Sequence, residues 1–245
     1  MTSKKNNLVI IIQARTDSTR FPRKILSNIK GKTMLWHIIE RIKKMDMGTI
    51  VIATTRRNID DEIISIAKTC GIQYYRGKKD DVLDRYLKAA LKYKARIIMR
   101  ITSDCPLIDP QETKKVFTKF LGGNFDYVTT DEKSYPKGLD TECFSINALK
   151  RAWQEAKSKS DREHVTQYIY NNPNKFRIGL TQSRIKNSVL HRWTVDYKDD
   201  LKFIRKIYSR LYNKKRIFLM QDILNLLKRE PDLIKINSKY NLQRK

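Results

Sequence analysis

The residues best suited to chemistry stand in one short stretch that follows an apolar run. Leu8 to Ile12 is aliphatic, and Arg15, Arg20, Arg23 and Lys24 come shortly after it. A buried strand that ends in a cationic loop is typical of the ligand-binding edge of an α/β sheet. Four cations held together repel one another unless an anion lies between them. We therefore expect this loop to bind the phosphates of a nucleoside triphosphate, to which Arg offers a fork and Lys a point charge.

The cationic loop follows neither common phosphate-binding pattern, because G-x-x-x-x-G-K-[ST] and G-x-G-x-x-G are both absent from it. The competing interpretation is an exposed, solvated loop. Its position directly after a predicted strand favours a binding role.

Two aspartates at the ends of other predicted strands are candidate metal ligands. Asp104 follows the predicted strand 96–102, and Asp196 follows the predicted strand 189–195. Alone, Asp104 would more often be a turn or cap residue. Two carboxylates opposite a phosphate-binding loop can share one Mg²⁺, which commonly takes only one or two protein carboxylates and completes its shell with phosphate and water.

Further polar residues are candidates for contact with a second substrate. Asp140 and Glu142 alternate on a predicted strand and share one of its faces, where they either bind hydroxyl or amino groups or are exposed. His164 is a candidate base or substrate contact. A single His on a helix is more often structural, and no Cys or second His has the spacing of a metal site.

Alternating strands and helices must position these residues. Hydrophobic periodicity predicts strands at 8–12, 49–54, 72–76, 96–102, 125–130, 141–145, 176–181 and 189–195. It predicts helices at 34–45, 60–70, 80–94, 110–121, 147–157, 162–171, 199–212 and 219–228. This order indicates an α/β fold with a mainly parallel central sheet and helices on both faces.

The chain is expected to form one domain over residues 1–230. The alternation breaks at 131–170, which we interpret as an insertion for substrate binding or for dimerisation into a homodimer. Residues 231–245 form a polar C-terminal tail, expected to be loosely attached. With 245 residues, of which 40% are hydrophobic, a single large core is feasible.

The overall charge favours an anionic partner. Lys and Arg number 52 and Asp and Glu 26, which gives a net charge of +26. A Lys-rich composition with solvated side chains is the competing explanation for this excess of positive charge.

No apolar run approaches the length of a membrane span, and the N-terminus does not resemble a secretion signal. Three widely spaced cysteines suggest no disulfide framework. From these features together we expect no membrane association and a cytoplasmic location.

Several segments together resemble one enzyme family. The segments that carry this resemblance occur in the family's order: QAR with S-x-R-x-P-x-K, RITSDCPLID, YPKGLDTECFS, REHVT and RWTVDYKDDL. The sequence resembles the cytidylyltransferase-like family named for spore-coat polysaccharide biosynthesis, a relative of the CMP-sialic acid and CMP-KDO synthetases. The resemblance implies a Rossmann-like nucleotide-diphospho-sugar transferase (GT-A-like) fold. It also implies CTP and Mg²⁺ as ligands, cytidylyl transfer to a small acceptor and release of pyrophosphate.

The resemblance also implies roles for residues at matching positions. The catalytic residues would be Arg15, Lys24 and Asp104, and the metal ligands Asp104 and Asp196. The nucleotide would contact Ala14, Arg15, Arg20, Lys24, Ala53, Thr54, Asp80 and Ser103. The acceptor, an anionic sugar acid, phosphosugar, polyol phosphate or phosphonate, would contact Asp140, Glu142, Arg162, Glu163 and His164.

Two other functions compete. A GT-A-type glycosyltransferase shares this architecture but typically places its metal on a D-x-D motif, whereas Asp104 has no second Asp two residues on. A nucleic-acid-binding protein is suggested by the basic C-terminal region, where residues 201–245 contain 13 Lys or Arg and 3 Asp or Glu. No helix-turn-helix, zinc finger or RNA-binding motif accompanies that charge, so no specific nucleic acid is expected.

Overall fold

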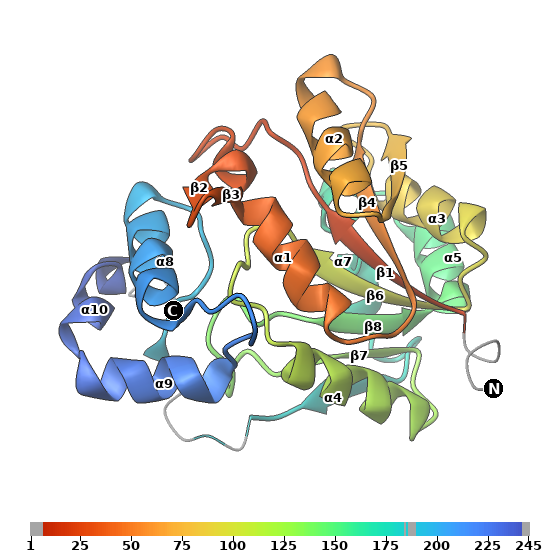
Figure 1. Ribbon diagram of the computed structural model, residues 1–245. Coiled ribbons are helices and arrows are strands. Elements are labelled where there is room, and N and C mark those ends of the chain that lie inside the picture. The colour runs from red at the N-terminus through yellow and green to blue at the C-terminus, as the bar shows by residue number, and fades with distance from the viewer. Residues whose placement is uncertain (1–6, 184, 186–189, 242–245) are drawn as a thin grey trace.

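A seven-stranded sheet forms the centre of the computed structural model, which describes residues 7–183, 185 and 190–241 (Figure 1). Its strands lie in the order β5-β4-β1-β6-β8-β7-β9, and only β8 runs antiparallel to its neighbours. The strands are β1 (Leu8–Gln13), β4 (Thr49–Thr55), β5 (Gln73–Gly77), β6 (Ile97–Thr102), β7 (Tyr127–Thr130), β8 (Glu142–Ser145) and β9 (Ile178–Thr181). The predicted mainly parallel sheet is confirmed.

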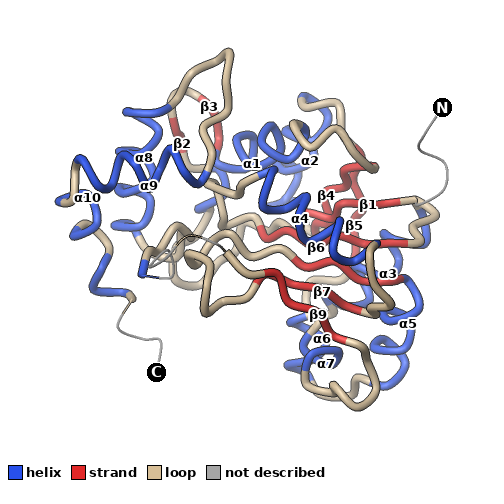
Figure 2. The backbone as a smooth tube through the Cα atoms, turned by 90° about the horizontal axis from the view of Figure 1, so that it is seen from below, coloured by secondary structure: helices blue, strands red, loops and turns tan. Residues whose placement is uncertain are grey.

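Helices cover both faces of this sheet (Figure 2). One face carries α1 (Met34–Lys43), α2 (Asp61–Thr69) and α4 (Pro110–Leu121), and the other carries α3 (Val82–Lys92), α5 (Ile146–Glu155), α6 (Lys159–His164) and α7 (Gln167–Tyr170). Side chains of β1 alternate between two apolar cores: Ile10 and Ile12 belong to one, Val9 and Ile11 to the other. This two-sided burial explains why β1 is an unbroken aliphatic run.

Short elements connect the sheet to its surroundings. They are the 3₁₀ turns η1 (Lys24–Leu26), η2 (Asn58–Asp60) and η4 (Ser238–Tyr240) and the hairpin strands β2 (Asn28–Ile29) and β3 (Lys32–Thr33). Thr33 is the N-cap of α1, since its side chain accepts a hydrogen bond from the backbone N of Trp36.

The predicted helix 162–171 is wrong as a continuous element, because a tight turn divides it into α6 and α7. Val165 has φ 60° and ψ −62°, and the N–H of Thr166 donates to the carbonyl oxygen of His164 at 2.6 Å. A γ-turn with positive φ is rare and strained, above all at a β-branched residue. Val165 is fully buried, so packing holds this conformation.

The expectation of a loosely attached tail is wrong for residues 231–241, which pack against the domain, while residues 242–245 lie outside the described residues. Helices α8 (Lys198–Leu211), α9 (Met220–Arg229) and α10 (Asp232–Lys235) lie together beside the sheet (Figure 1). Beyond α10, buried Asn237 donates to the carbonyl oxygen of Arg192 at 3.0 Å and to Asp200 Oδ1 at 2.9 Å. The ring of Tyr240 stacks on Tyr197, with centroids 4.1 Å apart.

Removal of the Asn237 side chain should therefore destabilise the domain. In Asn237→Ala both hydrogen bonds disappear. The buried carbonyl oxygen of Arg192 loses this donor, while Asp200 Oδ1 keeps only its bond from Arg192 Nε, so we expect the free energy of unfolding to fall by about 2 kcal/mol. Urea denaturation measures this change. Lys235→Ala, at a side chain 80% exposed on the same segment, is the control and should unfold like the wild type. Equal stability of the two variants would contradict a structural role for this segment.

Candidate active site

The cationic loop borders a cavity of about 430 Å³ at the carboxyl edge of the sheet. The loop leaves β1 after Gln13 and contributes one wall, while α3, the end of β6, α6 and Asp196 contribute the others. Predicted residues that line the cavity are Ala14, Arg15, Arg20, Lys24, Ser103, Asp104, Glu163, His164 and Asp196. The structure thus brings together residues from five separate parts of the chain.

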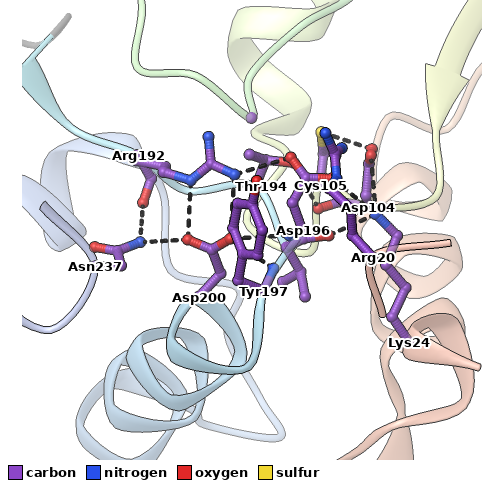
Figure 3. Close-up of polar contacts among 12 residues, drawn as sticks. Arg20, Lys24, Asp104, Cys105, Arg192, Thr194, Asp196, Tyr197, Asp200 and Asn237 are labelled. Carbon is purple, nitrogen blue, oxygen red and sulfur yellow. Dashed lines mark hydrogen bonds and ion pairs between the residues drawn. The ribbon is translucent and has the colours of Figure 1, made fainter. Parts of the chain in front are cut away.

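Lys24 is the point where these parts meet. Its ammonium group lies 3.1 Å from Asp196 Oδ1 and 3.3 Å from Asp104 Oδ2, and it donates to the carbonyl oxygen of Val195 at 2.6 Å (Figure 3). Lys24 is only 8% exposed. A buried cation is tolerated only where opposite charge and hydrogen bonds replace its hydration. The two carboxylates provide that charge, although they are distant in sequence.

Asp196 reaches Asp104 without the predicted strand 189–195. Val189 lies outside the described residues, and the segment from 190 on makes only one isolated bridge, between Arg192 and Lys137. Instead, the N–H of Val195 donates to the carbonyl oxygen of Asp104 at 2.8 Å, and Thr194 Oγ1 donates to the same oxygen at 3.2 Å. These direct backbone bonds, rather than a sheet ladder, join the two aspartates.

Asp196 is held by cations on two sides (Figure 3). Its Oδ2 accepts from Arg192 at 2.8 Å, and its Oδ1 accepts from Arg20 at 2.6 Å as well as from Lys24. Asp200 fixes this arrangement, since its Oδ2 accepts from the backbone N of Asp196 and its Oδ1 from Arg192 Nε. Burial alone would raise the pKa of Asp196, but the charges of Lys24 and Arg20 outweigh it and lower the pKa to about 2.

Arg15 and Arg20 are held less firmly than Lys24. The side chain of Arg20 is 58% exposed. Arg15 lies 3.7 Å from both Asp17 and Glu163, too far for hydrogen bonds, and is 36% exposed. Arg15 can therefore turn toward an anion in the cavity at little cost, whereas Arg20 would first have to leave its 2.6 Å bond to Asp196.

Asp104 and Asp196 are the donors available to a cation here. The described part of the chain contains no group of three or more His, Cys, Asp and Glu residues that could hold a metal ion. Two carboxylates suit Mg²⁺, which draws the remainder of its shell from water and phosphate. The donor set fits that metal and not a structural zinc ion, which needs four protein ligands.

Other predicted residues do not line the cavity. Ala53 and Thr54 are buried at the end of β4, and Asp80 is exposed before α3. Asp140 accepts from the backbone N of Gly138 at 3.0 Å, and Arg162 pairs with Asp81. The structure therefore places these residues outside the wall of the cavity.

Glu142 is part of an internal network. Both oxygens of its carboxylate accept a hydrogen bond from Arg100 Nη1, each at 2.9 Å, and Oε2 also accepts from Thr166 Oγ1 at 2.9 Å. Arg100 also donates to Gln13 Oε1 at 3.2 Å. Because an Arg side chain only donates, the Gln13 amide must turn its oxygen to Arg100. Glu142 thus supports a cavity residue, Gln13, that sequence reasoning did not single out.

Arg85 is a second residue that the sequence did not indicate. It lines the cavity, is 2% exposed and donates to the carbonyl oxygen of Lys78 at 2.7 Å. Its Nε has no hydrogen-bond partner in the described part of the chain, and burial lowers its pKa. A Cβ on Gly77 would lie 2.8 Å from its Cγ, so that glycine makes room for it. The one available signal was a cation on the apolar face of α3.

The protein-family model "Cytidylyltransferase" matches residues 9–228. An uncharacterized protein of Methanocaldococcus jannaschii is 36% identical over 94% of each chain, and the spore coat polysaccharide biosynthesis protein SpsF of Bacillus subtilis is 29% identical over 93% of this chain and 96% of its own length. A cytidylyltransferase from Leptospira borgpetersenii has a similar structure, with a TM-score of 0.88 and 31% identity over 94% of this chain and 97% of that one.

A more distant structure shares the fold. The CMP:2-keto-3-deoxy-manno-octonic acid synthetase, solved in complex with CTP, has a TM-score of 0.66 and 18% identity over 84% of this chain and 99% of its own. This likeness confirms the predicted Rossmann-like nucleotidyltransferase architecture.

The low pKa of Asp196 makes its contribution to stability dependent on pH. A carboxyl group whose folded pKa, about 2, lies below its ordinary pKa of 3.8 stabilises the protein above pH 4, and this stabilisation disappears as the pH falls toward 2. Asp196→Asn should therefore lower the free energy of unfolding at pH 7 by about 2 kcal/mol.

Urea denaturation of the variant and the wild type at several pH values measures this difference, which should shrink between pH 4 and pH 2. Asp232→Asn, at a side chain 85% exposed, is the control and should change stability little. If the difference in the free energy of unfolding between the variant and the wild type stays constant with pH, the charge of Asp196 does not stabilise the protein.

Proposed function

The chain belongs to the cytidylyltransferase family, and on this premise we propose that it transfers a cytidylyl group from CTP to a small anionic acceptor, with release of pyrophosphate. The acceptor would be a sugar acid, a phosphosugar, a polyol phosphate or a phosphonate. The spore-coat relative suggests a role in surface polysaccharide or glycoconjugate synthesis.

The observation that carries this proposal is the meeting of the cationic loop with two carboxylates at one cavity. Lys24 is fixed between Asp104 and Asp196, while Arg15 and Arg20 remain able to turn. A triphosphate in the cavity would face cations from several directions, as phosphate recognition requires. The strongly basic composition would add long-range attraction for such a ligand.

Mg²⁺ is the proposed cofactor, with Asp104 and Asp196 as its protein ligands. When bound, the ion would supply positive charge beside the phosphates. Arg20 would have to leave Asp196 Oδ1, to which it donates at 2.6 Å, for that oxygen to bind an ion. The exposure of Arg20 allows this, and the freed guanidinium would then meet the triphosphate.

The chain's own residues contribute mainly position and charge to the reaction. An oxygen of the acceptor would attack the α-phosphorus of CTP while the bond from that phosphorus to the pyrophosphate oxygen breaks in line with it. Lys24 and Arg15 would hold the departing pyrophosphate and offset its negative charge. Glu163 and His164, which also line the cavity, are the proposed contacts of the acceptor. An anionic acceptor oxygen needs no strong general base.

Arg85 is the proposed reader of the base. Cytosine offers two neighbouring acceptors, O2 and N3, whereas uracil carries a hydrogen on N3. A guanidinium group presents only donors, so it matches cytosine and opposes uracil. The deep burial of Arg85 in the cavity wall makes this selection strong, because a mismatched donor there would remain unpaired.

Two proposals concern the surroundings of the enzyme. All three cysteines are buried free thiols, which is consistent with the cytoplasm. None of the helices in the described ranges has both the length and the apolar character of a membrane span. A homodimer that uses residues 131–170 is proposed from the sequence alone.

A pyrophosphate-release assay tests the proposed reaction. Four nucleoside triphosphates are combined with a panel of sugar acids, phosphosugars, polyol phosphates and phosphonates. We expect release with CTP and Mg²⁺, its loss in Asp104→Ala, and at least a roughly tenfold loss in Lys24→Ala. The exposed variants Asp232→Ala and Lys235→Ala are matched controls and should keep wild-type rates. Full activity of Asp104→Ala would reject the metal role.

Base selection is tested by Arg85→Met, which keeps most of the buried volume and removes the donors. We expect KM for CTP to rise about tenfold and the preference for CTP over UTP to fall by a similar factor. Lys88→Ala, in the next turn of α3 and 52% exposed, should leave both quantities unchanged. If the preference for CTP survives in Arg85→Met, the base is read elsewhere.

A further inference from the structure

Asp60 lies outside the cavity and is connected to the cationic loop by hydrogen bonds. It is 1% exposed, at the end of η2 and directly before α2. Its Oδ1 accepts from both the backbone N and the Oγ1 of Thr16, each at 2.8 Å. Its Oδ2 accepts from Thr55 Oγ1, at the end of β4. One carboxylate therefore joins the loop to the sheet.

Thr16 is the residue through which Asp60 reaches the remainder of the loop. The carbonyl oxygen of Thr16 accepts from the backbone N of Arg23 at 2.7 Å, so Thr16 and Arg23 close the neck of the loop. Arg23 adopts a left-handed conformation with φ 58° there. Ser18, Thr19 and Arg20 of the closed loop line the cavity, and Lys24 follows the neck directly.

Asp60 acts in this arrangement through hydrogen bonds rather than through a salt bridge. None of the ion pairs among the described residues involves Asp60, whereas Asp104 and Asp196 both pair with Lys24. A buried carboxylate with three donors is well satisfied, and its removal would leave the backbone N–H of Thr16 without its acceptor and the hydroxyl of Thr16 with only the carbonyl oxygen of Ile59, at 3.3 Å. The neck would then lose its attachment to the end of β4 and the start of α2.

We propose that Asp60 is a positioning residue that holds the cationic loop ready for the triphosphate, an inference that rests on the proposed use of CTP. A loop fixed before binding loses less entropy when the ligand arrives, and its cations need not be reorganised. The β- and γ-phosphates, which depend on the loop, should benefit most. The cytidine and the α-phosphate should depend on Asp60 much less.

Calorimetric titration of CTP and of CMP, each with Mg²⁺, separates these contributions in the full chain. In Asp60→Ala we expect the Kd for CTP to rise at least about tenfold and the Kd for CMP to stay within about twofold of the wild type. Asp60→Asn should keep both values within about threefold, because its oxygen can accept the two bonds from Thr16 and its amide can donate to Thr55. Asp61→Ala, at the adjacent exposed residue, is the matched control.

The outcomes are distinct. If the wild type does not bind CTP, the proposed function fails. If the wild type binds CTP but Asp60→Ala binds it equally well, or if Asp60→Ala loses CTP and CMP affinity by the same factor, the positioning role alone is overturned. If Asp60→Asn binds CTP as weakly as Asp60→Ala does, the positioning role is also overturned, because the negative charge of Asp60 would then matter rather than its hydrogen bonds.

A second variant covers the case in which Asp60→Ala fails to fold. Thr16→Val removes the hydroxyl bonds to Asp60 Oδ1 and to the carbonyl oxygen of Ile59 but keeps the backbone bond to Asp60, and should weaken CTP binding about threefold without an effect on CMP. Amide hydrogen exchange supplies a readout that needs no ligand. The N–H of Arg23, at the neck, should exchange faster in Thr16→Val while the amides of β1 stay protected. Unchanged exchange and unchanged CTP affinity would reject the proposal.

Discussion

The whole arrangement depends on one buried ammonium group, that of Lys24. A cation that is 8% exposed must receive its compensating charge from the protein, and here this charge comes from Asp104 and Asp196. Lys24 follows β1, Asp104 follows β6 and Asp196 precedes α8. Their contact therefore ties the two halves of the chain together at the edge where a parallel sheet binds ligands. The same charges line the cavity in which the proposed triphosphate would lie.

The C-terminal part of the chain supports this contact rather than extending away from it. Asp196 is oriented by Arg192 and Asp200, and Asn237 completes the network from beyond α10. Arg192, Asp196 and Asp200 each have at least two partners in this hydrogen-bond network, which makes the position of Asp196 well determined. On the other side of the cavity, the strained turn at Val165 presents His164 and Glu163. Rigid support on both sides suits a reaction that relies on position and charge.

Sequence patterns predicted the elements that follow from local periodicity, and they failed where tertiary contacts decide. The aliphatic run of β1 and the apolar stripes of the long helices were sufficient to predict the parallel sheet and its binding edge. The segment before Asp196 looks like a strand in its composition, yet backbone bonds to Asp104 fix it instead. The partners of Glu142 and Asn237 and the burial of Arg85 arise from distant segments, so no local pattern could reveal them.

The most direct test of the central claim is a crystal structure with CTP and Mn²⁺, in which anomalous scattering identifies the ion. We predict that the ion contacts Asp104 and Asp196, that the triphosphate lies against Lys24, and that Arg20 has moved from Asp196 to the phosphates. An ion bound away from both aspartates, or a triphosphate that does not touch the cationic loop, would contradict the account.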